Sequence, residues 1–124
     1  MSSKDPKTDL ALLYLRKRCF SAFPLDELRS SFNLSASRLR HLIKTTTGLP
    51  PNRYIKHLRM RRAKELLTST FLSVKEIMVQ VGCNDPSHFI RDFKAIYGVS
   101  PGRYRLSLLE KRSDRSPHNR QRVA

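Results

Sequence analysis

The stretch SASRLRHLIKTTTGLPPNRY at residues 35–54 returns in altered form as DPSHFIRDFKAIYGVSPGRY at residues 85–104. Leu39, Ile43 and Leu49 correspond to Phe89, Phe93 and Val99, and six positions are identical at a constant separation of 50 residues. The identical pairs are Ser37 and Ser87, Lys44 and Lys94, Gly48 and Gly98, Pro51 and Pro101, Arg53 and Arg103, and Tyr54 and Tyr104. A repeat of this length predicts two copies of one supersecondary unit.

Each copy follows a shorter segment whose apolar residues have helical spacing. These residues are Leu25, Leu28 and Phe32 before the first copy, and Val74, Ile77 and Val81 before the second. Asn33 and Gly82 suit the left-handed conformation that ends a helix. Ser35 and Asp85 suit the N-cap of the helix that follows. Two helices joined by a turn of three or four residues form a helix-turn-helix, so the sequence predicts two such units.

The segment between the two units is predicted to be a helix as well. Pro50 and Pro51 fit its start, and an apolar stripe runs through Leu58, Ala63 and Leu66. About 16 residues at about 1.5 Å each give a rod of roughly 24 Å. Successive major-groove faces of B-DNA lie about 34 Å apart, so two units on one rod could read adjacent grooves as a monomer.

The polar faces of the repeated helices carry the candidate chemistry. If Leu39, Ile43 and Thr46 face the core, a second set of residues faces outward, because each residue turns the helix by about 100°. The outward residues are Ser37, Arg40, His41 and Lys44 in the first copy and Ser87, Ile90, Arg91 and Lys94 in the second. In a helix-turn-helix this face enters the major groove. Each arginine of these sets could pair with a guanine, and Ile90 could contact a thymine methyl group.

The charge of the chain favours a polyanionic partner. There are 25 Lys and Arg residues against 10 Asp and Glu, a formal net charge of +15. Residues 35–64 contain nine cations and no acid, whereas residues 73–104 contain four cations and three acids. We therefore expect the first unit to supply most of the electrostatic affinity.

The chain from about residue 10 to residue 108 resembles the DNA-binding domain of the AraC/XylS family of bacterial transcription regulators. The resemblance rests on Leu28, Ser35, Leu39, Lys44, Gly48, Pro51, Tyr54, Leu58, Arg59, Ala63, Leu66, Leu67, Ile77 and Gly82, and on the denser set Asp85, Ser87, Phe89, Arg91, Phe93, Lys94, Gly98, Ser100, Pro101, Tyr104 and Arg105. It implies an all-α fold of about seven helices in two helix-turn-helix subdomains joined by a long central helix. It also implies binding to double-stranded DNA and contact with RNA polymerase.

The resemblance also assigns site residues by position. Base contacts fall on Ser37, Arg40, His41, Pro86, Ser87, Ile90 and Arg91. We expect phosphate contacts from Arg38, Lys44, His88 and Lys94. Arg59, in the central helix, is open to two interpretations, a phosphate contact or an internal hydrogen-bond donor.

The expected organisation has five parts. They are a disordered N-terminus at residues 1–8, a first helix-turn-helix subdomain at 9–49, a linker helix at 50–68, a second subdomain at 69–112 and a disordered basic tail at 113–124. The chain departs from the family at Cys83, where phenylalanine is usual, and at Pro50, where a serine usually caps the helix. The effector-binding domain of most members has no counterpart here, which fits either the small stand-alone type or a fragment of a longer regulator.

Nothing in the sequence predicts an enzyme. The four histidines have no metal-ligand spacing, no glycine-rich phosphate loop is present, and no serine or cysteine has a recognisable base. We therefore expect no catalytic residue, metal ligand or cofactor. Cys19 and Cys83 fit reduced thiols. The sequence has no apolar run near 18 residues, so we expect no membrane span. We expect the protein to be cytoplasmic and associated with the nucleoid.

Two functions agree with the charge. The first is a sequence-specific, monomeric, DNA-binding transcription regulator. The alternative is a non-specific nucleic-acid-binding protein, an RNA-binding or chaperone-like basic helical protein, which would need no repeated recognition face. The aromatic residues fall at core positions, which disfavours the stacking platforms that single strands require.

Overall fold

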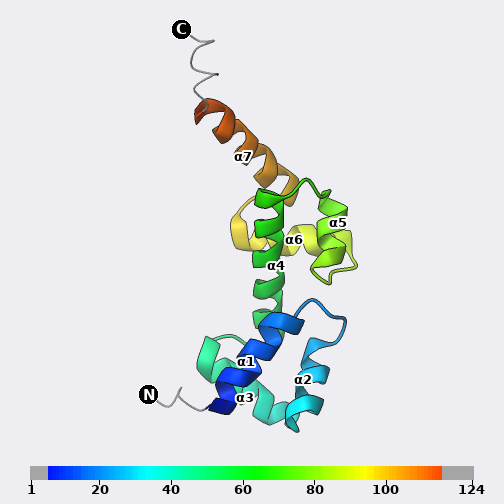
Figure 1. Cartoon of the computed structure of the whole chain (residues 1–124), viewed down its shortest axis with the longest axis vertical. Helices are drawn as coiled ribbons and strands as arrows, with labels where there is room; N and C mark the ends of the chain where they lie inside the picture. The colour runs from blue at the N-terminus through cyan, green and yellow to red at the C-terminus, as the bar shows by residue number, and fades with distance from the viewer. Residues whose placement is uncertain (1–5, 116–124) are drawn as a thin grey trace.

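The computed structural model describes residues 6–115 of the 124 in the chain, and this part contains seven helices and no strand. The helices are α1 (Pro6–Arg18), α2 (Pro24–Phe32), α3 (Ala36–Thr47), α4 (Pro51–Ser69), α5 (Val74–Gln80), α6 (Pro86–Tyr97) and α7 (Pro101–Arg115). Helix α4 runs through the middle, with α1 to α3 around one end and α5 to α7 around the other (Figure 1). The predicted all-α fold with two helix-turn-helix units is confirmed.

The two predicted turns have the expected backbone geometry. Asn33 ends α2 with φ 53°, and Gly82, between α5 and α6, has φ 86°. The Ser35 hydroxyl accepts a hydrogen bond from a backbone N–H in the first turn of α3, and the Asp85 carboxylate accepts two from the first turn of α6. These bonds satisfy N–H groups that have no partner inside a helix. Helices α3 and α6 therefore start at residues that the sequence specifies.

Helix α4 takes part in both hydrophobic cores. Its first half contributes Tyr54, Ile55 and Leu58 to a cluster with α1, α2 and α3, and its second half contributes to a cluster with α5 and α6. The residues of the second half are Met60, Ala63, Leu66 and Leu67. Its 19 residues span about 28 Å at about 1.5 Å each, somewhat more than expected. Pro50 at its N-cap makes no side-chain capping bond, as predicted.

Helices extend into both ends that the sequence predicts to be disordered. Helix α1 already begins at Pro6, a residue suited to the first turn because its missing N–H would have no partner there, and Thr8 is buried. Helix α7 continues to Arg115, because the sequence places no glycine or proline between Gly102 and Pro117 to end it. The remaining residues of these two predictions, 1–5 and 116–124, lie outside the described residues.

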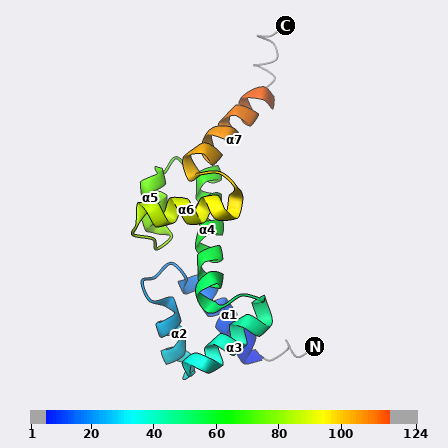
Figure 2. The ribbon, with the colours of Figure 1, turned by 180° about the vertical axis from the view of Figure 1, so that it is seen from behind.

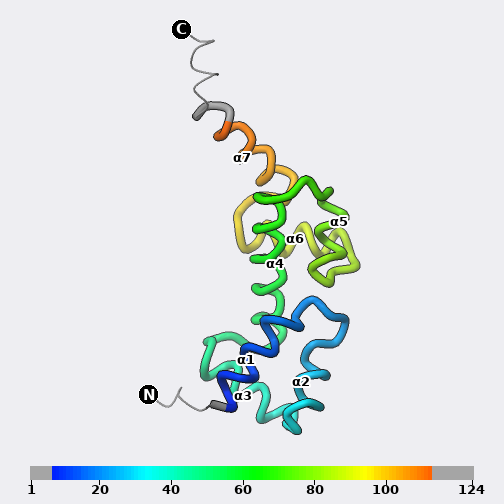
Figure 3. Tube along the Cα trace, viewed as in Figure 1, coloured from blue at the N-terminus to red at the C-terminus, as the bar shows by residue number. Residues whose placement is uncertain are grey.

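Helices α3 and α6 lie on the same side of α4. Seen from behind in Figure 2, α3 passes in front of α1 and α6 passes in front of α4, whereas in Figure 1 both lie at the back. The trace in Figure 3 shows that each follows directly on the shorter helix of its pair, α2 or α5. One face of the molecule therefore presents both second helices.

Candidate nucleic-acid interface

The predicted contact residues of α3 all lie on its exposed face. They are Ser37, Arg38, Arg40, His41 and Lys44. Leu39 and Ile43 are buried on the opposite face. The expectation that Thr46 faces the core is wrong: its side chain is exposed, and its hydroxyl donates to the Leu42 carbonyl at 2.9 Å. Thr47 is partly buried instead, and it satisfies its hydroxyl against the Ile43 carbonyl at 2.7 Å.

Helix α6 repeats this arrangement. Its predicted contact residues, all exposed, are Pro86, Ser87, His88, Ile90, Arg91 and Lys94. Phe89 and Phe93 fill the opposite face and are 1% and 0% exposed. Ile90 is 41% exposed, an apolar side chain on an otherwise polar face. Its place suits contact with an apolar group of a partner, such as the methyl group of thymine.

The two central arginines of these faces are free to bind. Within residues 7–112, no hydrogen bond or ion pair engages the side chain of Arg40, His41 or Arg91. Because a guanidinium carries five donors and stays charged, a free one on an exposed helix face is available for paired hydrogen bonds to a base or a phosphate.

The nine cations of residues 35–64 divide into two groups. Four have partners inside the protein: Arg59 with backbone carbonyls, Lys56 with Asp92, Arg62 with Glu65, and Lys64 over the ring of Tyr97 at 5.0 Å. The other five are exposed and have no partner in the part of the chain that the structure describes: Arg38, Arg40, Lys44, Arg53 and Arg61. The first unit thus offers fewer free cations than its composition suggests.

The four cations of residues 73–104 are all exposed, and none forms an ion pair with another described residue. What distinguishes this unit is its acids. Glu76 and Asp85 serve as helix-capping residues, so their negative charges stay close to α5 and α6. A difference in electrostatic affinity between the units would therefore come from these acids more than from the number of free cations.

Two arginines act inside the protein. Arg59 donates to the carbonyls of Cys19 and Ser21 at 2.7 and 2.9 Å, so it is an internal donor, which decides between the two interpretations of this residue. Arg105, on α7, donates to the carbonyls of Leu67 at 3.2 Å and Thr70 at 3.1 Å, and also to that of Leu72. Sequence reasoning assigned Arg105 no role. It closes the C-terminal end of α4, whose last carbonyls have no partner in the helix.

The remaining polar chemistry does not form a second site. Among the described residues, no three His, Cys, Asp or Glu side chains lie close enough together to hold a metal ion. Burial raises the pKa of the Cys19 and Cys83 thiols, so both are held in the neutral, less reactive form. Cys83 packs against the cluster that contains Phe89. Between residues 6 and 115, no helix has both the length and the apolar character of a bilayer span.

Two tight turns, each leading into an exposed basic helix on the same side of a shared central helix, define a helix-turn-helix protein of the bipartite type. The family model for this helix-turn-helix domain matches residues 28–107, which is more than half of the chain. The chain belongs to the AraC/XylS family of transcription regulators. Its relatives are regulators and not enzymes.

Two curated relatives show the extent of the similarity. The transcriptional regulator MtrA of Neisseria gonorrhoeae is 36% identical over 81 residues, which are 65% of this chain and 27% of MtrA. The transcriptional activator RhaS of Escherichia coli is 32% identical over 101 residues, which are 82% of this chain and 36% of RhaS. The chain therefore spans about a quarter to a third of the length of these relatives.

Solved structures agree with the fold. The C-terminal domain of the response regulator yesN from Fusobacterium nucleatum is 32% identical, with a TM-score of 0.75 over 82% of this chain and 99% of that one. The DNA-binding domain of AdpA, solved in complex with a target DNA, is 20% identical, with a TM-score of 0.81 over 87% of this chain and 97% of that domain. At that identity, AdpA supports the fold alone.

Proposed function

We propose that the chain is a sequence-specific, double-stranded DNA-binding transcription regulator that inserts α3 and α6 into adjacent major grooves as a monomer. The observation that carries the proposal is the placement of both exposed helices on one side of α4 (Figure 2). A duplex lying along that side would meet α3 and α6 in turn. In the proposed complex, residues 9–49 and 69–112 act as two reading units and residues 50–68 as the linker.

The proposed base contacts lie on the outer faces of the two helices. Arg40 and Arg91 would read guanine through paired hydrogen bonds, and Ile90 would contact a thymine methyl group. The other proposed base contacts are Ser37, His41, Pro86 and Ser87. Phosphates would be held by Arg38, Lys44, His88 and Lys94, which fix the register of the protein on the duplex without reading sequence.

A regulator of this kind works on the chromosome, so localisation to the nucleoid in the cytoplasm belongs to the proposal. Contact with RNA polymerase belongs to it as well, by analogy with the family.

A competition assay separates this function from non-specific binding. A duplex selected by the protein from random sequence is labelled and challenged with unlabelled duplexes at physiological salt. We expect the unlabelled selected duplex to compete at least about 1,000-fold better than a scrambled duplex, the lower end of the range for specific binders. Equal competition by both would establish the non-specific alternative.

A further inference from the structure

The loop between α1 and α2, residues 19–23, lies where the two units meet. Its Phe20 side chain packs against both hydrophobic clusters, the one around α1 to α3 and the one around α5 and α6. Within the described residues it is the single side chain that belongs to the packing of both. The loop is therefore a second connection between the two cores, in addition to α4.

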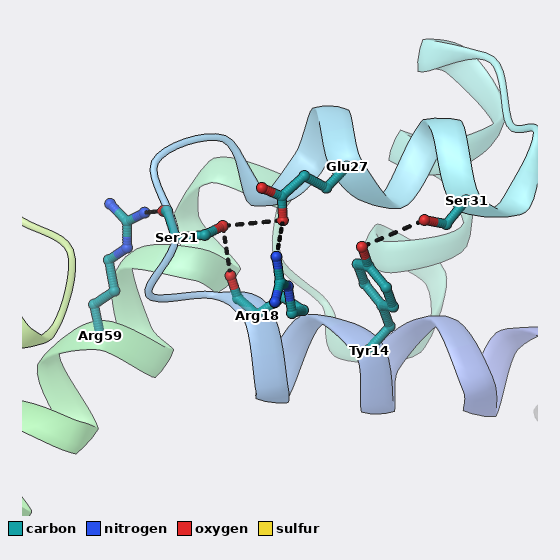
Figure 4. A network of polar contacts seen from close by, with 6 residues as sticks. All are labelled: Tyr14, Arg18, Ser21, Glu27, Ser31 and Arg59. Carbon is teal, nitrogen blue, oxygen red and sulfur yellow. Dashed lines mark hydrogen bonds and ion pairs between the residues drawn. The ribbon is translucent and has the colours of Figure 1, made fainter.

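Arg59 holds the backbone of this loop on both sides of Phe20. Its guanidinium donates from Nε to the carbonyl of Cys19 and from Nη2 to the carbonyl of Ser21. Figure 4 shows Ser21 at the centre of a further network, in which its hydroxyl also lies 3.1 Å from the carboxylate of Glu27. Charged donors on neutral carbonyls form strong hydrogen bonds, so the loop has one defined position relative to α4.

The turn of the second helix-turn-helix rests on this same loop. A Cβ atom built on Gly82 would lie 2.6 Å from the carbonyl oxygen of Phe20, closer than real Cβ contacts come. The turn that leads into α6 therefore touches the backbone of the first unit, and only glycine permits that approach. Lys56 of α4 and Asp92 of α6 add a partly exposed ion pair at 3.5 Å, a weak further tie.

We propose that this interunit contact, made by residues 19–21, Arg59 and Gly82, fixes the distance and angle between α3 and α6 and thereby selects the spacing of the two half-sites in the DNA. Arg59 is a positioning residue that touches no DNA, and Gly82 is the point at which the second unit contacts the loop between α1 and α2. The inference rests on the proposed two-groove binding. It adds that α4 alone does not set the spacing.

The matched pair Gly82→Ala and Gly98→Ala tests the contact. Both glycines have positive φ, 86° and 84°, so both variants carry the same backbone strain, but a Cβ at Gly98 meets nothing within 4 Å. The two half-sites selected by the wild-type protein are placed in duplexes whose separation varies in steps of one base pair. Binding to each duplex, and to each half-site alone, is measured together with the melting temperature.

We expect wild type and Gly98→Ala to prefer one separation by about 100-fold, the gain that two linked sites give when the linker fits. For Gly82→Ala we expect the preference to fall below about tenfold while binding to each isolated half-site persists. A sharp spacing preference in Gly82→Ala, with affinity lowered equally at every separation, would overturn the inference. If the wild type itself shows one half-site or none, the proposed function fails before the inference is reached.

A second pair keeps the test informative if Gly82→Ala does not fold. Arg59→Met keeps the apolar stem but removes the donors to the loop, whereas Arg62→Met removes the same charge from an exposed place on α4. We expect Arg59→Met to broaden the spacing preference and Arg59→Lys to restore part of it. Arg62→Met should lower affinity at every separation alike. Identical spacing profiles for Arg59→Met and Arg62→Met would overturn the role of Arg59.

Discussion

The proposed contact residues on α3 divide into side chains that would read bases and side chains that would hold the DNA backbone. Arg40 lies on the outward face with no internal partner, and Lys44 lies one turn later on the same face. Removing a guanidinium that is paired with one base weakens binding to DNA by about 1–3 kcal/mol. A lysine that contacts a phosphate contributes equally to the binding of all sequences. The two residues therefore predict different kinds of loss.

Replacing each by alanine tests that division. We expect Arg40→Ala to weaken binding by about 1–3 kcal/mol and to relax the preference at one base pair, and Lys44→Ala to weaken all duplexes alike. Binding to the selected duplex and to its single-base variants gives the answer. An equal loss of affinity for all duplexes in Arg40→Ala would instead assign Arg40 to the residues that contact phosphates.

The capping residue Glu76 predicts a pH dependence of stability. Its carboxylate accepts the N–H of Ser73, and this hydrogen bond lowers the pKa of Glu76 below its ordinary value of 4.5. Because the folded state lowers this pKa, the stabilisation is present above the ordinary value and is lost as pH falls through the folded value. Glu76→Gln keeps the side-chain acceptor but removes the charge.

The melting temperatures of wild type and Glu76→Gln should therefore differ most at neutral pH and converge as the pH falls below 4.5 through the lowered pKa of the folded state, since protonated glutamate resembles glutamine. Because the side chain is exposed, the difference should be small, and it should shrink further as salt is raised. Melting curves that stay equally far apart from pH 7 to pH 3 would contradict the assignment.

The sequence predicts these exposed residues well and the internal arginines poorly, for one physical reason. The outer faces of α3 and α6 follow from the 50-residue repeat and from helical periodicity, which are local properties. Arg59 and Arg105 donate to backbone carbonyls 33 to 40 residues away, and every residue carries such a carbonyl. No residue type marks the acceptor, so only the folded chain reveals the bond.

At the scale of the helices, α4 depends on how its C-terminal end is closed. Arg105 donates to carbonyls of Leu66, Leu67 and Thr70 at that end, and to one in the loop beyond. Thr70 adds its own hydroxyl bond to Leu66 at 2.7 Å. These bonds connect α7 to α4 and define where the linker helix stops.

Removing the Arg105 donors should cost more than removing a neighbouring charge. We expect Arg105→Met to lower the free energy of unfolding by about 2 kcal/mol or more, because several partly buried carbonyls lose charged donors together. Arg103→Met is the control, since Arg103 is exposed and its side chain makes no contact of this kind among the described residues. Urea unfolding of both variants measures the difference, and equal midpoints would show that the Arg105 bonds contribute little.

The starts of α3, α4 and α6 were predictable, whereas the start of α1 and the burial pattern in the last turn of α3 were less so. Ser35, Asp85 and the proline at the start of α4 are local signals, and the structure confirms all three. Helix α1 begins at Pro6, three residues before the predicted start of the first subdomain at residue 9, because burial of Thr8 depends on tertiary packing. The position of Thr46 was misjudged for the same reason, since the last turn of α3 can satisfy a threonine hydroxyl on either side.

The described part of the molecule is elongated, with α3 and α6 on one side (Figure 2). Both units carry exposed cations. Three permanently charged residues are proposed phosphate contacts: Arg38, Lys44 and Lys94. Each phosphate neutralised releases counterions from the duplex, so the logarithm of the affinity should fall with the logarithm of salt concentration with a slope of about −3 or steeper. Titrations between about 50 and 200 mM salt measure it, and a slope near zero would exclude the proposed phosphate contacts.

Selection of random duplexes by the purified protein, followed by sequencing, tests the central claim most directly. Two helices on one side of a stiff linker should enrich two sequence blocks whose centres lie about one helical turn, roughly 10 base pairs, apart. The blocks need not be palindromic, because equivalent positions of α3 and α6 carry different residues, such as Arg40 and Ile90. A single short block, or no enrichment, would contradict reading by two helices.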